Sequence, residues 1–225
     1  MANRPLAKGV AGVEVLGQTV SRECSGPLRR SRSGYGRNVL MTTRRAQSDI
    51  RLISDRLVLR EFAVTDEDAV HGFAGDPLVT RLTDWGPNSI EDTRAFLAEA
   101  TAQVTNPQRA EFTLAAVHAS SGRIIGSVSI GVTSVQHQRG EFGFVFHRDF
   151  WSQGYATEAS TLLLRFGFDR LRLRRVSATC HPENHASARV LEKTGLEFEG
   201  RMRSHLFVRG AWRDSLLYAA VNSDC

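Results

Sequence analysis

Apolar and polar residues begin to alternate regularly near residue 51, and this alternation defines the first expected element. From Arg51 to Phe62, apolar residues such as Leu57 and Leu59 alternate with charged ones, a period near two that predicts a β-strand. Two helices are expected to follow. The first begins at residue 65 or 66, where a hydroxyl or carboxylate side chain caps it, and the second runs from Ser89 to about Gln103.

From residue 111 onward, the pattern predicts further strands and helices. Gly195 is the expected C′ residue of the last helix, and Arg209-Gly210 is the expected turn of a final hairpin. The order of elements, β-α-α-β-β-β-α-β-α-β-β, predicts an α/β fold with a mixed sheet. The expected strands cover Glu111 to His118, Ile124 to Gly131, Glu141 to His147, Arg175 to Cys180, Leu196 to Phe207 and Ala211 to Val221, and the helices cover Thr157 to Asp169 and the residues after the Asn184 cap.

One junction in this pattern has the form of a phosphate-binding site. A short loop containing Gly154 joins the strand that begins at Glu141 to the helix that follows. Amides in the first turn of a helix have no internal partner and carry partial positive charge, and glycine permits a tight turn beside a ligand. The backbone amides from Ser152 to Thr157 are therefore candidates to hold the phosphates of a cofactor, with Ala156 also small enough for close approach.

Two segments near this junction carry a specific resemblance. Residues 150–159 read FWSQGYATEA, and residues 181–196 read HPENHASARVLEKTGL. Together they resemble the GCN5-related N-acetyltransferase (GNAT) superfamily, which uses acetyl-coenzyme A (acetyl-CoA). Within it they are most similar to the RimJ/RimL-like branch, which acetylates the N-termini of ribosomal proteins. Ser152 replaces the first glycine of the branch pattern and Leu196 its final phenylalanine. The resemblance runs from about Ile53 to Val221.

The resemblance implies a fold and a place for the cofactor. In this superfamily a mostly antiparallel sheet of about seven strands is flanked by about four helices. Its fourth and fifth strands splay apart, and the cofactor enters the resulting V. Trp151 stands where relatives outside the branch have Arg or Gln, so Gln153 is expected to supply that donor. The residues assigned to acetyl-CoA are Phe144, Val145, Phe146, Trp151, Ser152, Gln153, Gly154, Tyr155, Ala156, Thr157, Asn184 and Ser187.

The same resemblance implies how the thioester reacts. A main-chain amide of the fourth strand, between Gly143 and Phe146, polarises the carbonyl as it becomes an oxyanion. Asn184 caps its helix and also contacts the pantetheine arm. Ser187 lies one helical turn further on, near the thioester sulfur, where it hydrogen-bonds or protonates the thiolate. Many relatives use a tyrosine three residues later, but this chain has Val190 there.

The remaining assignments are the general base and the binding site of the amine that accepts the acetyl group. Glu141 matches the acidic position from which several relatives draw a proton from the amine. His205 is its rival, since a neutral imidazole accepts protons near neutral pH. Asp84 and Trp85 lie in the loop that lines the acceptor site in this superfamily, where a carboxylate attracts an ammonium and an aromatic ring covers it.

These assignments predict direct attack of a primary amine on acetyl-CoA in a ternary complex. Cys180 lies within an expected strand, so no covalent acetyl-enzyme is expected, and no metal is implied. The branch favours a protein N-terminal α-amine as acceptor. A polyamine or antibiotic acceptor stays open, as does a non-catalytic sensor that binds acyl-CoA. Both a monomer and a homodimer are compatible with the sequence.

The composition indicates a cellular compartment, and it argues against a membrane-spanning protein and against a nucleic-acid-binding domain. The chain has 225 residues, of which 41% are hydrophobic, and lacks a run long enough to span a membrane. Its three cysteines, Cys24, Cys180 and Cys225, show neither metal spacing nor a disulfide framework, which indicates the cytoplasm. The net charge of +5 is carried by residues 1–49, at +6, so the remainder, at −1, is not a nucleic-acid-binding domain.

The basic N-terminal segment, residues 1–48, is expected to be disordered and is separate from the acetyltransferase domain at 49–225. Three interpretations of it stay open. It is a tail with no fixed role, or translated sequence upstream of a start at Met41, or a targeting or RNA-contacting arm.

Overall fold

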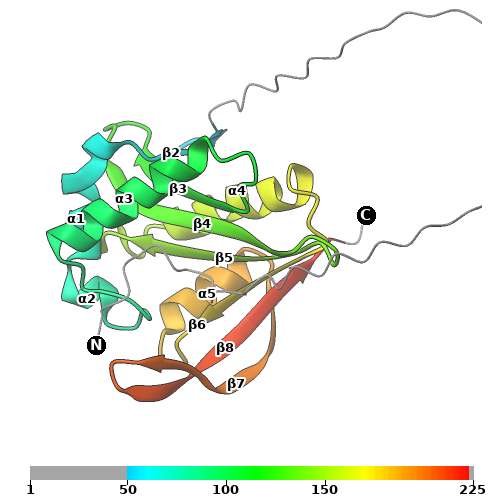
Figure 1. Cartoon of the computed structure of the whole chain (residues 1–225). Helices are drawn as coiled ribbons and strands as arrows, with labels where there is room; N and C mark the ends of the chain where they lie inside the picture. The colour runs from blue at the N-terminus through cyan, green and yellow to red at the C-terminus, as the bar shows by residue number, and fades with distance from the viewer. Residues whose placement is uncertain (1–49, 223–225) are drawn as a thin grey trace, which may run out of the picture.

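The computed structural model describes residues 50–222 as one mixed sheet with helices on both faces (Figure 1). The segment predicted to be disordered, residues 1–48, lies outside the described residues. The strands are β1 (Arg51–Ile53), β2 (Leu57–Glu61), β3 (Glu111–His118), β4 (Ile124–Ser134), β5 (Arg139–Phe146), β6 (Arg175–Cys180), β7 (Glu197–Val208) and β8 (Ala211–Val221); the α-helices are α1 (Glu67–Ala74), α2 (Pro77–Thr80), α3 (Ile90–Val104), α4 (Tyr155–Asp169) and α5 (His185–Lys193); and the 3₁₀ turns are η1 (Val64–Asp66) and η2 (Arg148–Phe150).

The sheet has the order β1-β2-β3-β4-β5-β6-β8-β7, and within it only β5 and β6 are parallel neighbours. Their pairing covers three residues of β5, from Arg139 to Glu141, which lies opposite Ser177. Beyond this point the two strands separate, together at the right of Figure 1 and apart at the left. The predicted splay of two central strands is therefore confirmed, and Glu141 lies at the fork.

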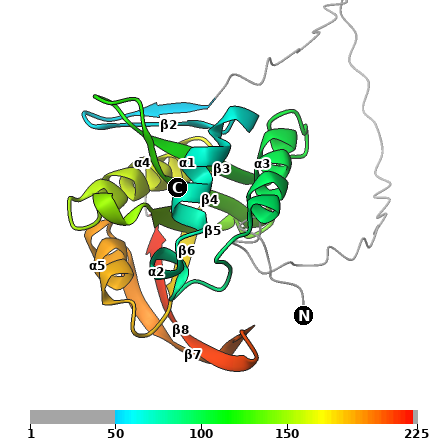
Figure 2. The ribbon, with the colours of Figure 1, turned by 90° about the vertical axis from the view of Figure 1, so that its left-hand side faces the viewer.

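Helices cover the two faces of the sheet in separate layers, with α3 on one side and α4 and α5 on the other (Figure 2). Because successive side chains of a strand point to opposite faces, one strand contributes to both cores. Leu114 and Ala116 of β3 belong to the core that includes residues of α4 and α5, whereas Ala115 belongs to the core beneath α1 and α3. Both cores consist of buried apolar side chains, which gives the fork a rigid frame.

The sequence prediction differs from the structure at the first strand. A single strand was expected from residue 51 to 62, but the chain turns at residues 54–56, and β1 pairs antiparallel with β2. Ser54 holds the turn, since its amide donates to the Leu57 carbonyl at 2.9 Å and its hydroxyl accepts from the Leu57 amide at 3.2 Å. Serine readily makes such local bonds, and alternation in hydrophobicity does not reveal them. The described residues thus form eight strands rather than about seven, and the short α2 adds a fifth α-helix.

Candidate active site

The N-terminus of α4 has no side-chain cap, unlike those of α3 and α5. Its N-cap is Gly154, in the left-handed conformation at φ 85°, and no side chain bonds to the helix end. In contrast, Ser89 caps α3 by accepting from the amide of Asp92, and Asn184 caps α5 by accepting from the amide of Ser187. The N–H groups of α4 therefore stay available to a ligand.

Six consecutive amides form this open end. The helical hydrogen bonds of α4 begin with the Glu158 amide, which donates to the Gly154 carbonyl at 3.0 Å. Among the described residues, no hydrogen bond has a backbone N–H from Ser152 to Thr157 as its donor. Free amides in a helix's first turn, reinforced by the helix dipole, bind anions such as phosphate. The segment that was predicted to hold phosphates is thus open in the structure.

Side chains of the same loop hold it in place. The indole N–H of Trp151 donates to the Phe146 carbonyl at 2.8 Å, and the Gln153 side chain donates to the Asp149 carbonyl at 2.8 Å. Tyr155 is buried, and its hydroxyl lies 3.1 Å from the ring of His118. These side chains fix the conformation of the loop. The Gln153 side chain, expected to donate to phosphate, donates to the protein here.

A remote arginine, which the sequence did not reveal, also braces the loop. Arg56 lies in the turn between β1 and β2 and donates to the Gln153 carbonyl at 3.1 Å. Its Nε donates to the Glu158 carboxylate at 2.8 Å, and its guanidinium lies over the Tyr155 ring, 4.6 Å from the centroid. This brace exists because the chain turns at residues 54–56, so an unbroken strand prediction could not have found it.

A cleft of about 170 Å³ opens where β5 and β6 separate. It is bordered by the loop between α2 and α3, by strands β3 to β6, by α5, and by single residues of β7 and β8. The cleft brings together several residues predicted for different roles. From the acceptor, catalytic and cofactor assignments, it is lined by Asp84, Trp85, Glu141, Phe144, Val145, Asn184 and Ser187.

Glu141 is the most perturbed carboxylate that lines the cleft. Burial, and to a smaller extent the neighbouring charge of Asp84, raises the pKa of Glu141 to about 7. In the sheet, Gly131 separates Glu141 from Glu111 in register, so both carboxylates lie on the same face. Burial, and then the charge of Glu99, also raises the pKa of Glu111. This face of the fork therefore favours a cationic ligand that can give up a proton.

The opposite wall of the cleft is the first turn of α5. Asn184 accepts from the Ser187 amide at 3.0 Å, which confirms its predicted capping role. Ser187 is half-buried and lines the cleft, and its hydroxyl makes no hydrogen bond to any other described residue. Ser187 and Glu141 thus line the same cleft.

Comparison with known proteins identifies the architecture. Residues 56–197 match the family described as an acetyltransferase (GNAT) domain. The uncharacterized N-acetyltransferase YnaD of Bacillus subtilis is 30% identical over 78% of this chain and 99% of its own length. A GNAT acetyltransferase structure from Bacillus anthracis is 30% identical, covers 76% of this chain and 98% of that chain, and has a TM-score of 0.68.

The chain belongs to the GNAT acetyltransferase family. Mycobacterium smegmatis RimJ, solved with CoA-disulfide, shares the GNAT fold, with a TM-score of 0.69, 23% identity, and coverage of 79% of this chain and 90% of that chain. Membership makes this protein an acetyl-CoA-dependent N-acetyltransferase. The open amides at the start of α4 and the unpaired edge of β5 suit a long phosphate-bearing substrate of this kind.

Several predicted site residues do not line the cleft of this GNAT domain. His205 is not among the described residues that line the cleft; its ring nitrogen lies 3.0 Å from the Ser215 hydroxyl. Burial lowers the pKa of His205, and Arg213 lowers it further. On the same hairpin, the Asp214 carboxylate accepts from the Arg201 guanidinium and from the Ser204 amide. Phe146 and the loop from 151 to 157 also lie outside the cleft lining.

Sequence reasoning missed the residues that β6 and β8 contribute to the cleft. Arg213 of β8 lines it, as do Cys180 and His181 at the end of β6. His181 stands at the start of the second GNAT-like segment, which was a usable signal. Arg213 had none, because its partners lie about 130 residues earlier in the chain. Among residues 50–222, no helix is long and apolar enough to cross a membrane, and no group of three acidic, His or Cys side chains is placed to bind a metal.

Proposed function

We propose that this enzyme acetylates a primary amine by direct attack in a ternary complex, with Glu141 as the general base. The amine nitrogen bonds to the thioester carbon, its proton passes to Glu141, and the carbon–sulfur bond breaks. Asp84 and Trp85 receive the acceptor ammonium, and the Ser187 hydroxyl hydrogen-bonds to the departing thiolate. The diphosphate of acetyl-CoA binds to the amides from Ser152 to Thr157.

The observation that carries this proposal is that Glu141 lies at the fork with a pKa raised by burial. A general base works best when its pKa lies near the operating pH, and burial brings the pKa of Glu141 to about 7. His205, the rival base, is bonded to Ser215 and outside the cleft lining. The position of Glu141 in the cleft and its pKa near neutral pH therefore favour it over His205 as the general base.

The unpaired edge of β5 supports carbonyl polarisation by the main chain. Beyond Glu141, no strand of the described residues pairs with the edge of β5 that faces β6. Backbone N–H groups of a strand alternate between its two edges, so some amides between Phe142 and Phe146 face the fork. Such fixed donors stabilise a developing oxyanion without reorganisation.

The same base favours an N-terminal α-amine as the acceptor. An α-ammonium has a pKa of about 8, so its proton passes to a base of pKa about 7 at a cost of about 1.4 kcal/mol. An alkylammonium of pKa about 10.4 would cost roughly 4.6 kcal/mol with the same base. The resemblance of the two signature segments to the RimJ/RimL-like branch favours the same acceptor class.

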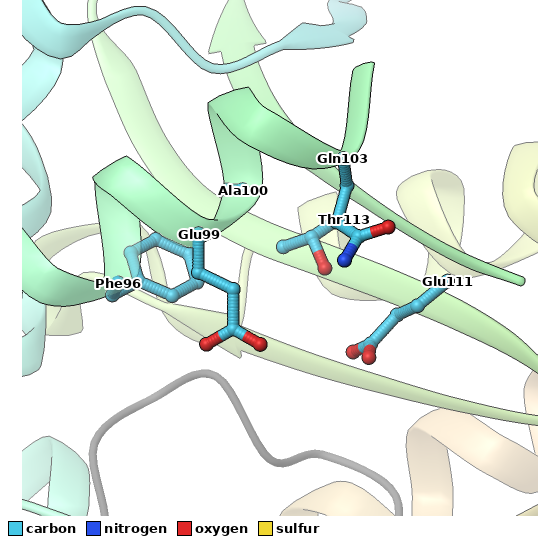
Figure 3. A pocket seen from close by; sticks show the side chains of 6 residues that line it. All are labelled: Phe96, Glu99, Ala100, Gln103, Glu111 and Thr113. Carbon is cyan, nitrogen blue, oxygen red and sulfur yellow. The ribbon is translucent and has the colours of Figure 1, made fainter. Parts of the chain in front are cut away.

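A small polyamine is the second candidate, and one observation favours it. A side pocket of about 20 Å³ adjoins the cleft and shares Glu111 and Thr113 with it. Figure 3 shows the side chains of Glu99, from α3, and Glu111, from β3, at this pocket. A space of this size holds about one water molecule or one ammonium group. A second cationic group of a polyamine would bind there.

A panel of amines incubated with the protein and acetyl-CoA tests the proposal. We expect thiol release, and a mass gain of one acetyl group, with peptides that have free α-amines. The same peptides blocked at the N-terminus should give neither. Preferred turnover of a polyamine would identify the second candidate. Tight acetyl-CoA binding with no acetylated product from any amine would contradict the proposed activity.

A further inference from the structure

Five carbonyl oxygens, one at the last residue of α2 and four in the loop between α2 and α3, converge on two arginines from the opposite end of the chain. Arg209, in the β7–β8 turn, donates to four of them and Arg213 donates to two, with Thr83 shared. The distances are 3.1 Å from Arg209 to Thr83, 3.0 Å from Arg209 to each of Thr80, Trp85 and Gly86, and 3.2 and 3.0 Å from Arg213 to Leu82 and Thr83.

The conformation of Arg209 is unfavourable for an arginine. The turn has two residues, Arg209 at φ 50° and Gly210 at φ 83°, between the paired Val208 and Ala211. Two-residue hairpin turns with positive φ at both positions favour Asn or Asp followed by Gly. The backbone alone therefore favours Asn at this position, while the carbonyl contacts require a guanidinium.

The loop held by these arginines carries the acceptor residues. Asp84 and Trp85 line the cleft, whereas Arg209 is not among the described residues that do so. Any effect of Arg209 on the reaction must therefore pass through the loop. Arg213 both lines the cleft and bonds to the loop, so its substitution would mix two effects.

We propose that Arg209 and Arg213 are positioning residues that hold residues 80–86 against the β7–β8 hairpin, so that Asp84 and Trp85 face the acceptor amine. This inference rests on the proposed function, because it assigns that loop to the acceptor. Planar guanidinium groups suit the role, since one group presents several N–H donors in fixed directions, whereas an ammonium acts as a compact point charge. Recognition of the acceptor amine thus depends on the β7–β8 hairpin, which contains the last two strands of the described residues.

Steady-state kinetics of three Arg209 variants test the proposal. Arg209→Met should raise the KM for the amine about tenfold and change the KM for acetyl-CoA less than twofold. Arg209→Lys should restore part of the loss, because an ammonium reaches some of the carbonyls. Arg209→Asn suits the turn but lacks the reach, so it should resemble Arg209→Met. Arg201→Met, on the same hairpin but bonded to Asp214, is the matched control and should behave as wild type.

Hydrogen exchange of the loop gives an independent measurement. The amides of Thr83 and Asn88 are bonded within this region, and both should exchange faster in Arg209→Met and Arg209→Asn than in Arg201→Met. Unchanged exchange would overturn the inference, as would a wild-type amine KM in Arg209→Asn or equal losses for both substrates. A wild-type protein that acetylates no amine would contradict the proposed function instead, and the exchange data would still report on the loop.

Discussion

Two loops border the fork of this sheet, and they present opposite backbone groups to their surroundings. The loop before α4 leaves the amides from Ser152 to Thr157 unpaired, facing whatever binds there. The loop between α2 and α3 turns its carbonyls to Arg209 and Arg213. The unpaired amides of the first loop suit an anion. In the second loop, the protein's own arginines satisfy the carbonyls, while the side chains of Asp84 and Trp85 line the cleft.

The two loops also differ in how far away their supports lie. Two of the side-chain bonds that hold the loop before α4 join residues four or five positions apart, from Trp151 to Phe146 and from Gln153 to Asp149, and Arg56 and His118 add bonds from earlier in the chain. The loop between α2 and α3 has local bonds too, but the arginine bonds to its carbonyls span more than 120 residues. A locally built loop leaves a mark in the sequence, whereas a loop held from afar does not. This difference explains why the cofactor of the enzyme is easier to assign than its acceptor.

The largest expected effect lies on the acceptor side. Glu141→Gln should lower kcat about a thousandfold, since positioned general bases contribute about 10²- to 10⁴-fold. In the wild type, kcat/KM should rise with pH through about 7, as the Glu141 carboxyl loses its proton and becomes a base. That component should vanish from the pH profile of Glu141→Gln, while the affinity for acetyl-CoA stays unchanged.

Thermal unfolding provides the control for folding of this variant. The folded-state pKa of Glu141, about 7, lies above the ordinary value of 4.5, so burial of the ionised carboxylate destabilises the native state above pH 7. Glu141→Gln should therefore raise Tm above pH 7 and leave it nearly unchanged below pH 4.5. A lower Tm at both pH values would mean that lost activity reports misfolding rather than a lost base.

The next effect lies on the cofactor side and should spare the amine. Gly154→Asp places a carboxylate beside the amides, and a Cβ there meets Arg56 at 3.4 Å. Repulsion of the diphosphate should raise the KM for acetyl-CoA about a hundredfold. Gly154→Asn is the matched control, because Asn tolerates positive φ and has nearly the same shape without the charge. Equal rises in both KM values would argue against this placement of the phosphates.

Ser187→Ala sharpens the comparison between the proposed acetyl-CoA site and the proposed amine site, because Ser187 is expected at the thioester sulfur. Loss of a hydrogen bond to the leaving thiolate should lower kcat about tenfold with both KM values nearly constant. Pre-steady-state thiol release, compared with the wild type, would locate the loss in the chemical step. A wild-type kcat in this variant would mean that Ser187 only packs in the first turn of α5.

The smallest effect concerns Arg56, the arginine that braces the loop before α4 from the β1–β2 turn. Arg56→Lys keeps the charge but cannot bond to both Gln153 and Glu158 in the same planar arrangement. We expect a rise of about threefold in the KM for acetyl-CoA alone, since Arg56 is partly exposed. Arg94→Lys, which alters the exposed pair with Glu67, should change neither KM.

The sequence predicted those parts of the site that neighbouring residues build. The Gly154 loop, the Asn184 cap and the residues at the start of α5 follow from local spacing and resemblance, and Glu141 lies at the predicted splay. The positions of Arg56 and Arg209 depend on contacts between distant segments, for which hydrophobic periodicity carries no signal.

His205 shows the same limit of prediction from sequence, because the partner of its ring depends on how two strands pair. Its residue type suited a base, but its ring is bonded to Ser215 of the neighbouring strand, and that register is a property of the folded hairpin. A bulge between Met202 and Leu206 shifts the pairing of β7 with β8. Such shifts change which face a side chain occupies, and alternation read from sequence cannot locate them.

A crystal structure with coenzyme A would test the central claim most directly. The account predicts that oxygens of the diphosphate lie within about 3 Å of backbone nitrogens between Ser152 and Thr157, with α4 directed at the phosphates. Phosphates bound elsewhere on the domain, with these amides turned to solvent, would contradict it.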